Sequence, residues 1–399
     1  MPNNMTKKTV FIFWTERLNP LRGGVHRIII LLLKHLPLRG FNVHYLYTLD
    51  DYASFNIYNE DSSKEESIKV ENLKSYLLDH HCEIILGQDG VFSNRLTQVV
   101  RQMALPGIKF INEYHNSLLL IPNKLSKEYL KFEFVNTKSL RVKIGSAIKY
   151  VFYPIWKWKI WKAVSQLYRF NFLNSDVTLL LTSREEPIVR RILSKNDKIK
   201  CVAIPNPLSW EKVEDESILT HKKKEVLVVS RIYNPEKRID LILKIWCELQ
   251  KRNVTEGWIL RIVGDGIHKP LLMRMAEDMK LRGVVWEGWS NPIPFYHSAS
   301  LFMMTSSCEG WGLTLTESMQ TGVVPVAFDS YPALHDIIND GYDGYIIKNN
   351  DIAFYADRMQ NLMQNDDLRN QIAKNGLVSC KRFATEKIMD MWSQLLNSI

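Results

Sequence analysis

Two glutamates, Glu309 and Glu317, stand eight positions apart on either side of a turn bracketed by glycines. The apolar stretch 301–304 before them predicts a short buried strand, and 314–321 predicts a helix that ends at Gly322. A strand, a glycine-containing loop and a helix start in this order expose free backbone N–H groups at the positive end of the helix dipole. Such an arrangement binds anions, most simply a phosphate. The turn itself consists of Gly310, Trp311, Gly312 and Leu313.

A structural role for both glutamates is the alternative interpretation. Thr314 and Glu317 match a capping box, in which the glutamate lies in the first helical turn and only closes the helix start. Glu309, in a loop, can equally be a solvated side chain. The choice between a binding site and a helix cap therefore depends on the rest of the chain.

Two cations are predicted at the end of another strand. The stretch 226–229 predicts a strand, Arg231 follows it, and Lys237 opens the next helix. The carboxyl edge of a parallel sheet is where open α/β proteins bind ligands. Arg231 offers a planar fork of donors suited to phosphate, and Lys237 offers a point charge. The alternative is a solvated basic turn.

The N-terminal half contains two weaker candidates. A predicted strand at 9–14 is followed by Gly23 and Gly24 and then by helical spacing, which again places glycines between a strand and a helix start. His115 follows a predicted strand at 109–113 and would lie at the carboxyl edge of its sheet. A simple glycine turn and a structural histidine are the alternatives.

Strands and helices alternate in both halves of the chain. This alternation predicts an α/β protein with two parallel, doubly wound sheets that face each other across a cleft. The polar stretch 50–69 is predicted to be a loop or a short helix. The predicted boundaries are 1–205 for a first domain, 206–224 for a linker, 225–384 for a second domain and 385–399 for a last helix.

Composition narrows the class of protein further. The 399 residues carry a net charge of +9, which favours anionic partners. The five cysteines form no C-x-x-C pair, which argues for free thiols in a reducing compartment and against a zinc site. No apolar run reaches the roughly 18 residues that span a bilayer, and 9–14 is too short for a signal peptide. We therefore expect a cytoplasmic protein without a transmembrane helix.

The segment 138–172 has an unusual composition. It contains eight lysines and arginines, nine aromatic residues and no aspartate or glutamate. Basic charge mixed with tryptophan and tyrosine is typical of a segment at a membrane interface, here an anionic surface. The alternatives are a helix pair whose rings fill the core, and a surface on which single-stranded nucleic acid stacks.

Together, these motifs resemble the C-terminal half of the family-4 retaining glycosyltransferases, which have the GT-B fold with two Rossmann-like domains. The family pattern comprises an arginine and a lysine six positions apart, a Gly-Asp-Gly turn, two glutamates in an E-x7-E motif, and a Gly-x-Pro-Val stretch. Ser230, Trp311 and Ser318 depart from the usual glycine, phenylalanine and alanine. The matching residues are Arg231, Pro235, Lys237, Gly264-Asp265-Gly266, Glu309, Gly310, Gly312, Glu317, Gly322 and Val324-Pro325-Val326, with Gly23-Gly24, His115 and Ile204-Pro205-Asn206 as weaker matches.

The resemblance implies transfer of a sugar from a nucleoside-diphosphate donor to an acceptor hydroxyl, with retention of configuration. It implies that 1–205 binds the acceptor, that 225–384 binds the nucleotide sugar, and that 385–399 returns to the first domain. No Asp-x-Asp occurs in the chain, so we expect no metal and no other cofactor. We expect an acceptor in polysaccharide or lipid-linked glycan synthesis, with the protein peripheral on the inner face of the cell membrane. A soluble acceptor, or a basic nucleic-acid-binding protein without catalysis, is the alternative.

The resemblance also assigns roles to the candidate residues. Arg231 and Lys237 would neutralise the leaving diphosphate, and Glu309 would hold hydroxyls of the donor sugar. Glu317 would accept the ribose hydroxyls, and His115 would line the same site from the first domain. The implied catalytic residues are Arg231, Lys237, Glu309 and His115, and the implied donor-binding residues are Gly23, Gly24, Arg231, Lys237, Gly310, Trp311, Gly312, Leu313 and Glu317.

Overall fold

The computed structural model describes residues 7–19, 23–88 and 94–399. Their contacts divide the chain into two compact units, each of which is an α/β structure. The first unit contains the described residues of Met1–Leu118 together with Lys159–Pro207 and Thr385–Ile399. The second unit contains Leu119–Trp158 and Leu208–Ala384.

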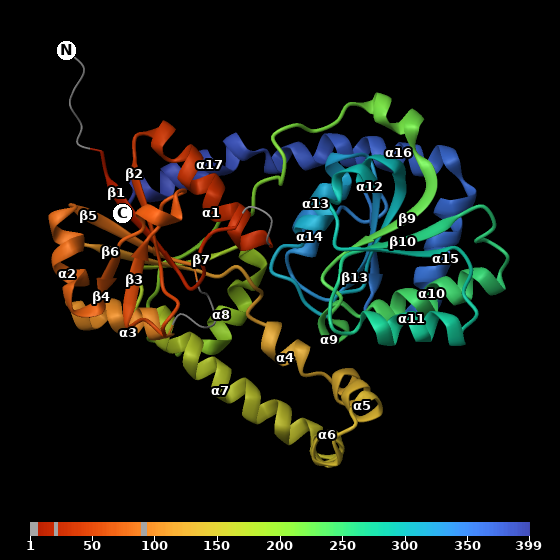
Figure 1. Ribbon diagram of the computed structural model, residues 1–399, viewed down its shortest axis with the longest axis horizontal. Coiled ribbons are helices and arrows are strands. Elements are labelled where there is room, and N and C mark those ends of the chain that lie inside the picture. Colours follow the sequence, from red (N-terminus) through yellow and green to blue (C-terminus); the bar gives the residue numbers. More distant parts are fainter. Residues whose placement is uncertain (1–6, 20–22, 89–93) are drawn as a thin grey trace. The chain divides into compact units, whose positions relative to one another are not determined.

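Within the described residues, the first unit has an eight-stranded sheet in the order β4-β3-β2-β1-β5-β6-β7-β8 (Figure 1). The pairs β2–β3 and β3–β4 are antiparallel, and the other pairs are parallel. The strands are β1 (Thr9–Trp14), β2 (Asn42–Tyr47), β3 (Ser54–Ile57), β4 (Ser67–Lys69), β5 (Cys82–Gly87), β6 (Lys109–Glu113), β7 (Val177–Leu180) and β8 (Cys201–Ala203). The helices of this unit are α1 (Gly24–His35), α2 (Val70–Asp79), α3 (Asn94–Met103), α8 (Glu186–Ile192), α17 (Thr385–Asn397) and most of α7 (Tyr153–Leu173).

The central strand β1 is buried on both faces. Val10 and Ile12 join a core formed with α1 and α17, whereas Phe11 and Phe13 join a second core with α2 and α3. A strand covered on both sides has no polar face, which is why its sequence is continuously apolar. On α17, Trp392 is buried in the first of these cores together with Ile388, Met389, Leu395 and Leu396.

The stretch 50–69 differs from its prediction. It contains the antiparallel strands β3 and β4, of which β4 is the edge of the sheet, instead of only a loop or helix. Phe55 on β3 is fully buried and makes an edge-on contact with Phe13, with 5.2 Å between ring centroids. Tyr52 is buried in the same core, so a few scattered apolar side chains anchor this polar stretch, and they form a weak pattern in the sequence.

The second unit has a six-stranded parallel sheet in the order β11-β10-β9-β12-β13-β14. The strands are β9 (Lys223–Val229), β10 (Ile259–Val263), β11 (Val284–Gly288), β12 (Ala299–Met304), β13 (Val324–Asp329) and β14 (Tyr345–Lys348). The helices of this unit are α4 (Leu120–Lys124), α5 (Lys127–Asn136), α6 (Leu140–Val151), α9 (Asn234–Lys237), α10 (Ile239–Lys251), α11 (Lys269–Asp278), α12 (Ile293–Ser298), α13 (Leu313–Gln320), α14 (Leu334–Ile337), α15 (Ile352–Gln364) and α16 (Asp366–Ser379).

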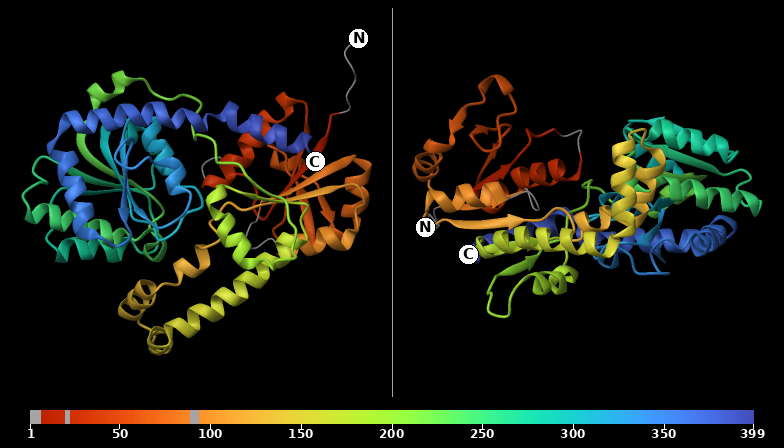
Figure 2. Two further views of the ribbon diagram at one scale, coloured as in Figure 1. Left: turned by 180° about the vertical axis from the view of Figure 1, so that it is seen from behind. Right: turned by 90° about the horizontal axis from the view of Figure 1, so that it is seen from below.

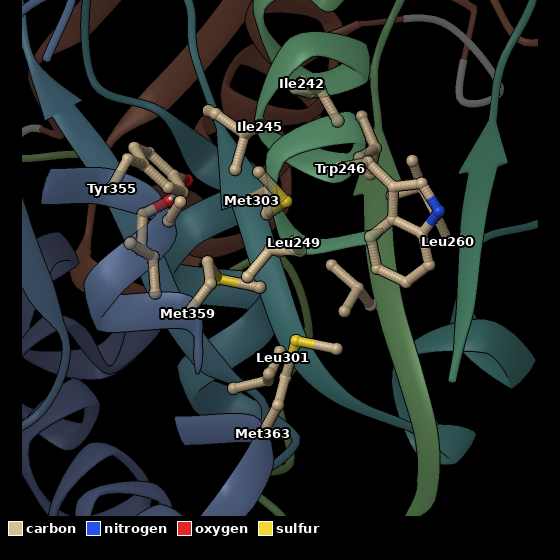
Figure 3. Close-up of a cluster of buried hydrophobic side chains, with 14 of the residues drawn as sticks. Ile242, Ile245, Trp246, Leu249, Leu260, Leu301, Met303, Tyr355, Met359 and Met363 are labelled. Atoms are coloured by element: carbon tan, nitrogen blue, oxygen red, sulfur yellow. Dashed lines mark hydrogen bonds between the residues drawn. The ribbon is translucent and has the colours of Figure 1, made fainter. Parts of the chain in front are cut away.

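One face of this sheet packs against α10 and α15 around large apolar side chains (Figure 3). Trp246 of α10 is fully buried, and its indole N–H donates to the carbonyl of Arg282 at 2.9 Å. Tyr355 of α15 is also fully buried, and its hydroxyl donates to the carbonyl of Val326 at 2.5 Å. Both polar atoms are thus satisfied, as burial of a tyrosine or tryptophan requires.

The stretch predicted as a linker, 206–224, packs on the second unit from Leu208 onward. The Gln320 amide donates to the carbonyls of Trp210 and Lys212 at 2.5 and 2.8 Å. The Lys222 ammonium donates to the carbonyls of Tyr296 and Thr321 at 2.8 and 2.7 Å. These bonds fix the stretch against α12 and the end of α13.

The basic aromatic segment 138–172 is divided between two environments. Tyr168 and Phe172, near the end of α7, are fully buried and contact the ring of Tyr114 in the first unit, at 5.8 and 5.6 Å between centroids. In contrast, α6 and the start of α7 expose most of their apolar side chains. In the part of the chain that the structure describes, no helix is both long enough and apolar enough to cross a bilayer.

Figure 2 shows the same elements from behind and from below, with helices on both faces of each sheet.

Candidate active site

A turn with two glycines braces the loop that follows β9. The amide of Ser230 donates to the carbonyl of Val263 at 3.1 Å, and that of Ile232 donates to the carbonyl of Asp265 at 2.8 Å. Gly264 has a positive φ of 135°, and a Cβ there would lie only 1.9 Å from the carbonyl oxygen of Ser230. Only glycine allows this approach of two backbones, so the Gly264-Asp265-Gly266 motif has a clear structural role.

Lys237 lies between two carboxylates at the end of α9. Its ammonium is 2.6 Å from Glu309 Oε1 and 3.4 Å from Glu236 Oε1, and 16% of its side chain is exposed. Burial favours the neutral amine, but the charges of Glu309 and Glu236 outweigh it and raise the pKa of Lys237 above its ordinary value. Lys237 is therefore a fixed cation beside the Glu309 turn, although 72 positions separate the two residues.

Arg231 reaches this cluster through Glu236. Its guanidinium donates to both Glu236 oxygens, at 3.2 and 3.1 Å, and lies 5.4 Å from the ring centroid of Tyr233. Its side chain is 63% exposed, so its planar donor fork remains accessible to a ligand. Glu236, which links the two cations, is not among the residues predicted from the sequence.

Arg238 locks this loop onto the segment after β12. It adopts a left-handed backbone with φ of 51°, and its buried guanidinium donates to the carbonyls of Thr305 and Ser306 at 2.5 and 2.7 Å. The amide of Ser307 in turn donates to the carbonyl of Glu236 at 2.7 Å. Burial lowers the pKa of Arg238 to about 10, so it stays charged at neutral pH. Arg238 is a further residue that the sequence motifs did not single out.

The turn after Glu309 leads directly into α13. This helix begins at Leu313, and its N-cap is Gly312 in the left-handed region at φ 90°. The N-cap is not Thr314, and no side chain of the described residues caps this end, so the capping-box interpretation of Thr314 and Glu317 is wrong. The first turn carries no acidic residue, and Glu317 lies in the second turn rather than the first as predicted.

Glu317 and Trp311 both point into the protein. Only 1% of Glu317 is exposed, and its carboxylate accepts a hydrogen bond from the Ser209 hydroxyl at 2.6 Å. Trp311 is 2% exposed and packs edge-on against Phe383, with 5.0 Å between ring centroids. The Trp311 ring is thus part of the core, and a donor contact by this residue stays a prediction.

The remaining predicted residues belong to the first unit. His115 is hydrogen-bonded through Nε2 to Gln88 Oε1 at 2.5 Å, and the Gln88 amide donates to Glu113 Oε2 at 2.7 Å. Gly23 precedes α1 and Gly24 is its first residue, next to positions 20–22, which lie outside the described residues. Gln88 and Glu113 were not predicted, although they end β5 and β6 at the same sheet edge as His115.

Burial keeps this network uncharged at neutral pH. It raises the pKa of the Glu113 carboxyl to about 8, against the opposing effect of the hydrogen bond from Gln88, and it lowers the pKa of His115 to about 3. A neutral His115 donates from Nε2 to Gln88, which leaves Nδ1 as an acceptor. The network thus selects one tautomer of His115.

The raised pKa of Glu113 predicts a pH-dependent stability. In the folded protein Glu113 keeps its proton up to about pH 8, whereas in the unfolded chain it loses it near pH 4.5. Its contribution to stability is therefore complete below pH 4.5 and is lost as pH rises through 8, at up to about 1.4 kcal/mol per pH unit. Urea unfolding of wild type and Glu113→Gln at several pH values measures this. The wild type should lose stability relative to the variant as pH rises, and a constant difference would contradict the assignment.

The candidate site residues of the second unit lie in a region that matches a known protein family. Residues 211–378 match the family model described as glycosyl transferases group 1, and this range includes Arg231, Lys237, Glu309 and Glu317. A poly(ribitol-phosphate) alpha-N-acetylglucosaminyltransferase of Staphylococcus aureus is 33% identical over 41% of this chain and 34% of its own length. The Campylobacter jejuni GalNAc-alpha-(1->4)-GalNAc-alpha-(1->3)-diNAcBac-PP-undecaprenol alpha-1,4-N-acetyl-D-galactosaminyltransferase is 22% identical over 87% of this chain and 98% of its own.

The chain spans only part of several relatives. It covers 34% of the length of the Staphylococcus aureus transferase, 61% of an uncharacterized glycosyltransferase of Haemophilus influenzae and 50% of the amylovoran biosynthesis glycosyltransferase AmsD of Erwinia amylovora. Solved structures match more fully. The pneumococcal O-GlcNAc transferase GtfA, in complex with UDP and GlcNAc, has a TM-score of 0.68 at 13% identity over 98% of this chain and 99% of that chain. HepE of Anabaena, in complex with UDP, has a TM-score of 0.65 at 13% identity over 98% and 100%. The predicted fold class, GT-B with two Rossmann-like units, is confirmed.

Proposed function

We propose that this protein is a retaining glycosyltransferase that uses a nucleoside-diphosphate sugar without a divalent metal. The observation that carries the proposal is the Lys237 ammonium, held 2.6 Å from Glu309 beside the uncapped start of α13. A diphosphate at this point would meet a fixed cation and free backbone donors together. The family match over 211–378 and the UDP bound in the structural neighbours GtfA and HepE support a nucleotide donor.

In this proposal the donor replaces a carboxylate as the partner of Lys237. The diphosphate takes the place of Glu309 beside the ammonium, and Glu309 turns to the hydroxyls of the donor sugar. Negative charge grows on the leaving diphosphate as the glycosidic bond breaks, so Lys237 and Arg231 stabilise the transition state more than the bound substrate. A front-face route, in which the leaving phosphate assists the incoming hydroxyl, accounts for retention. His115, Gly23 and Gly24 of the first unit are kept as proposed donor contacts.

The proposed acceptor is a polysaccharide or lipid-linked glycan at the inner face of the cell membrane. Relatives named for poly(ribitol-phosphate) and for an undecaprenol-linked glycan support this class. Hydrolysis of a panel of nucleotide sugars tests the donor, because transferases of this kind release free sugar slowly when acceptor is absent. Cleavage of one donor at a rate above buffer would support the proposal. Absence of UDP or other nucleoside-diphosphate binding by calorimetry would refute it.

The role of Glu317 gives a test that separates ribose from phosphate. Glu317→Gln keeps the volume and the bond to Ser209 but removes the charge that two ribose hydroxyls would meet. We expect the dissociation constant for UDP to rise about tenfold, whereas that for inorganic pyrophosphate, which has no ribose, stays the same. Calorimetric titration of both ligands measures this. An equal loss for both ligands would assign Glu317 a structural role only.

A further inference from the structure

A stripe of aliphatic side chains lies on the exposed side of α6. Its members follow the spacing i, i+4, i+8 and i+11, which places them on one face of a helix. A helix of a globular protein normally turns such a face toward the core, so an exposed one indicates a surface that is covered by something else. The stripe consists of Leu140, Ile144, Ile148 and Val151, which are 71, 52, 55 and 71% exposed.

The start of α7 extends the stripe with larger side chains. Phe152, Ile155 and Trp158 are 56, 55 and 59% exposed. We call residues 127–158, which comprise α5, α6 and the start of α7, the helical arm. The helical arm belongs to the second unit.

The helical arm has a separate inner side that holds it together. Ser146, on the opposite side of α6 from the stripe, is buried and donates from its hydroxyl to the carboxylate of Glu133 on α5. The same carboxylate accepts from the hydroxyl of Tyr129 at 2.8 Å. The exposed stripe is therefore not the inner face of this helix pair.

Positive charge surrounds the stripe. Lys138, Arg141, Lys149 and Lys157 are exposed, and no acidic residue occurs anywhere in 138–172. Several of these cations lie over aromatic rings, such as Lys149 at 5.6 Å from the centroid of the Trp156 ring. Aromatic rings paired with basic side chains are characteristic of the boundary between headgroups and acyl chains.

We propose that the helical arm docks peripherally on an anionic bilayer, with the aliphatic stripe among the acyl chains and the lysines and arginine at the lipid phosphates. The positive charge of α6 and the start of α7, which lie in the segment 138–172 without acidic residues, complements an anionic headgroup layer. Nucleic acid fits less well, because stacking needs flat rings and the stripe is mostly aliphatic. This inference deepens the proposed function and rests on it for the membrane-linked acceptor, but its geometry concerns the helical arm alone.

The helical arm is joined by continuous contacts to the loop that carries Arg231. The Phe132 ring of α5 lies 5.4 Å from the His268 ring, which lies 5.3 Å from that of Tyr233. Arg231 lies over the same Tyr233 ring at 5.4 Å. A bilayer bound to the helical arm would therefore hold the unit that carries the phosphate-binding cations.

Flotation with lipid vesicles tests the docking surface. We expect the wild type to float with vesicles of phosphatidylglycerol and phosphatidylcholine at low salt, to float less at high salt, and to remain in the bottom fraction with phosphatidylcholine alone. Ile144→Glu/Ile148→Glu should lose most of this binding. The matched control is Leu38→Glu/Leu49→Glu, which alters two side chains of the first unit that are 76 and 71% exposed and should float as the wild type does.

Two results would overturn the inference: wild type that does not float with anionic vesicles at low salt, or a stripe variant that floats as well as the wild type. Binding of single-stranded RNA without vesicle binding would assign the surface to nucleic acid instead. Circular dichroism and UDP titration of each variant control for folding. Flotation needs no nucleotide, so failure of docking and failure of UDP binding are recorded separately.

Discussion

Lys237→Ala should lower turnover with the correct donor by at least about 100-fold, the cost of removing one preorganised donor to a developing negative charge. Before the donor binds, Glu309 at 2.6 Å and Glu236 at 3.4 Å hold the ammonium at the point where the diphosphate is proposed to replace Glu309. Affinity for the intact nucleotide sugar should fall much less, by about tenfold, because its diphosphate lacks the negative charge that develops as the glycosidic bond breaks. Steady-state kinetics and calorimetry together measure the two effects.

Two variants control for charge and for fold. Lys244→Ala removes a second ion-paired lysine of the same unit, which is 42% exposed and whose ammonium lies 2.9 Å from Asp240, and should leave turnover unchanged. Lys237→Arg keeps the charge but changes its geometry and should recover part of the activity. If Lys237→Ala retains wild-type turnover while it remains folded, the assignment of the diphosphate to this cluster is wrong.

Most residues of the candidate site in the second unit could be predicted from the sequence. Its motifs combine glycines, which the backbone conformation requires, with charged residues that suit a phosphate. Gly264 allows a close approach of two backbones, and Gly312 adopts a left-handed backbone. Both glycines belong to the same set of sequence motifs as Arg231, Lys237 and Glu309. Local spacing alone placed Glu317 one turn too early. The helix starts at Leu313 because Gly312 supplies the left-handed N-cap, so the Thr314 hydroxyl is not needed as a cap.

The residues that were missed depend on contacts between distant positions. Arg238 is an unremarkable basic residue until the fold brings the carbonyls of Thr305 and Ser306 to its guanidinium. Gln88 and Glu113 are single polar residues at the ends of buried strands, where position at the carboxyl edge was the one available signal. Contacts between residues so far apart in the chain leave no short sequence pattern from which they could be predicted.

The composition of the segment 138–172 could not show which of its side chains are buried and which are exposed. Its membrane and core interpretations apply to different parts, since Tyr168 and Phe172 fill the first unit's core while Ile144 and Ile148 are exposed. Both pairs have the same four-residue spacing, so helical periodicity identifies a face without stating what covers it. Membrane contact by the exposed part stays a prediction, with flotation as its test.

Gly264→Ala should destabilise the second unit by more than about 4 kcal/mol, an exceptional value for a single methyl group. The new Cβ would lie 1.9 Å from the carbonyl oxygen and 2.9 Å from the carbonyl carbon of Ser230, and both are backbone atoms that cannot rotate away. The turn would have to separate from the loop that carries Arg231, which breaks the bond from the Ser230 amide to Val263. Urea unfolding of the variant measures the loss.

Gly257→Ala is the matched control, because it separates backbone strain from the clash. Gly257 also has a positive φ, of 74°, but no atom of the residues that the structure describes lies within 4 Å of the Cβ that the substitution adds. It should therefore cost only the strain of a left-handed alanine, about 1–2 kcal/mol. Similar losses for both variants would mean that φ alone determines the effect. A clearly larger loss for Gly264→Ala, together with weaker UDP binding in any folded fraction, would show that the glycine turn positions the Arg231 loop.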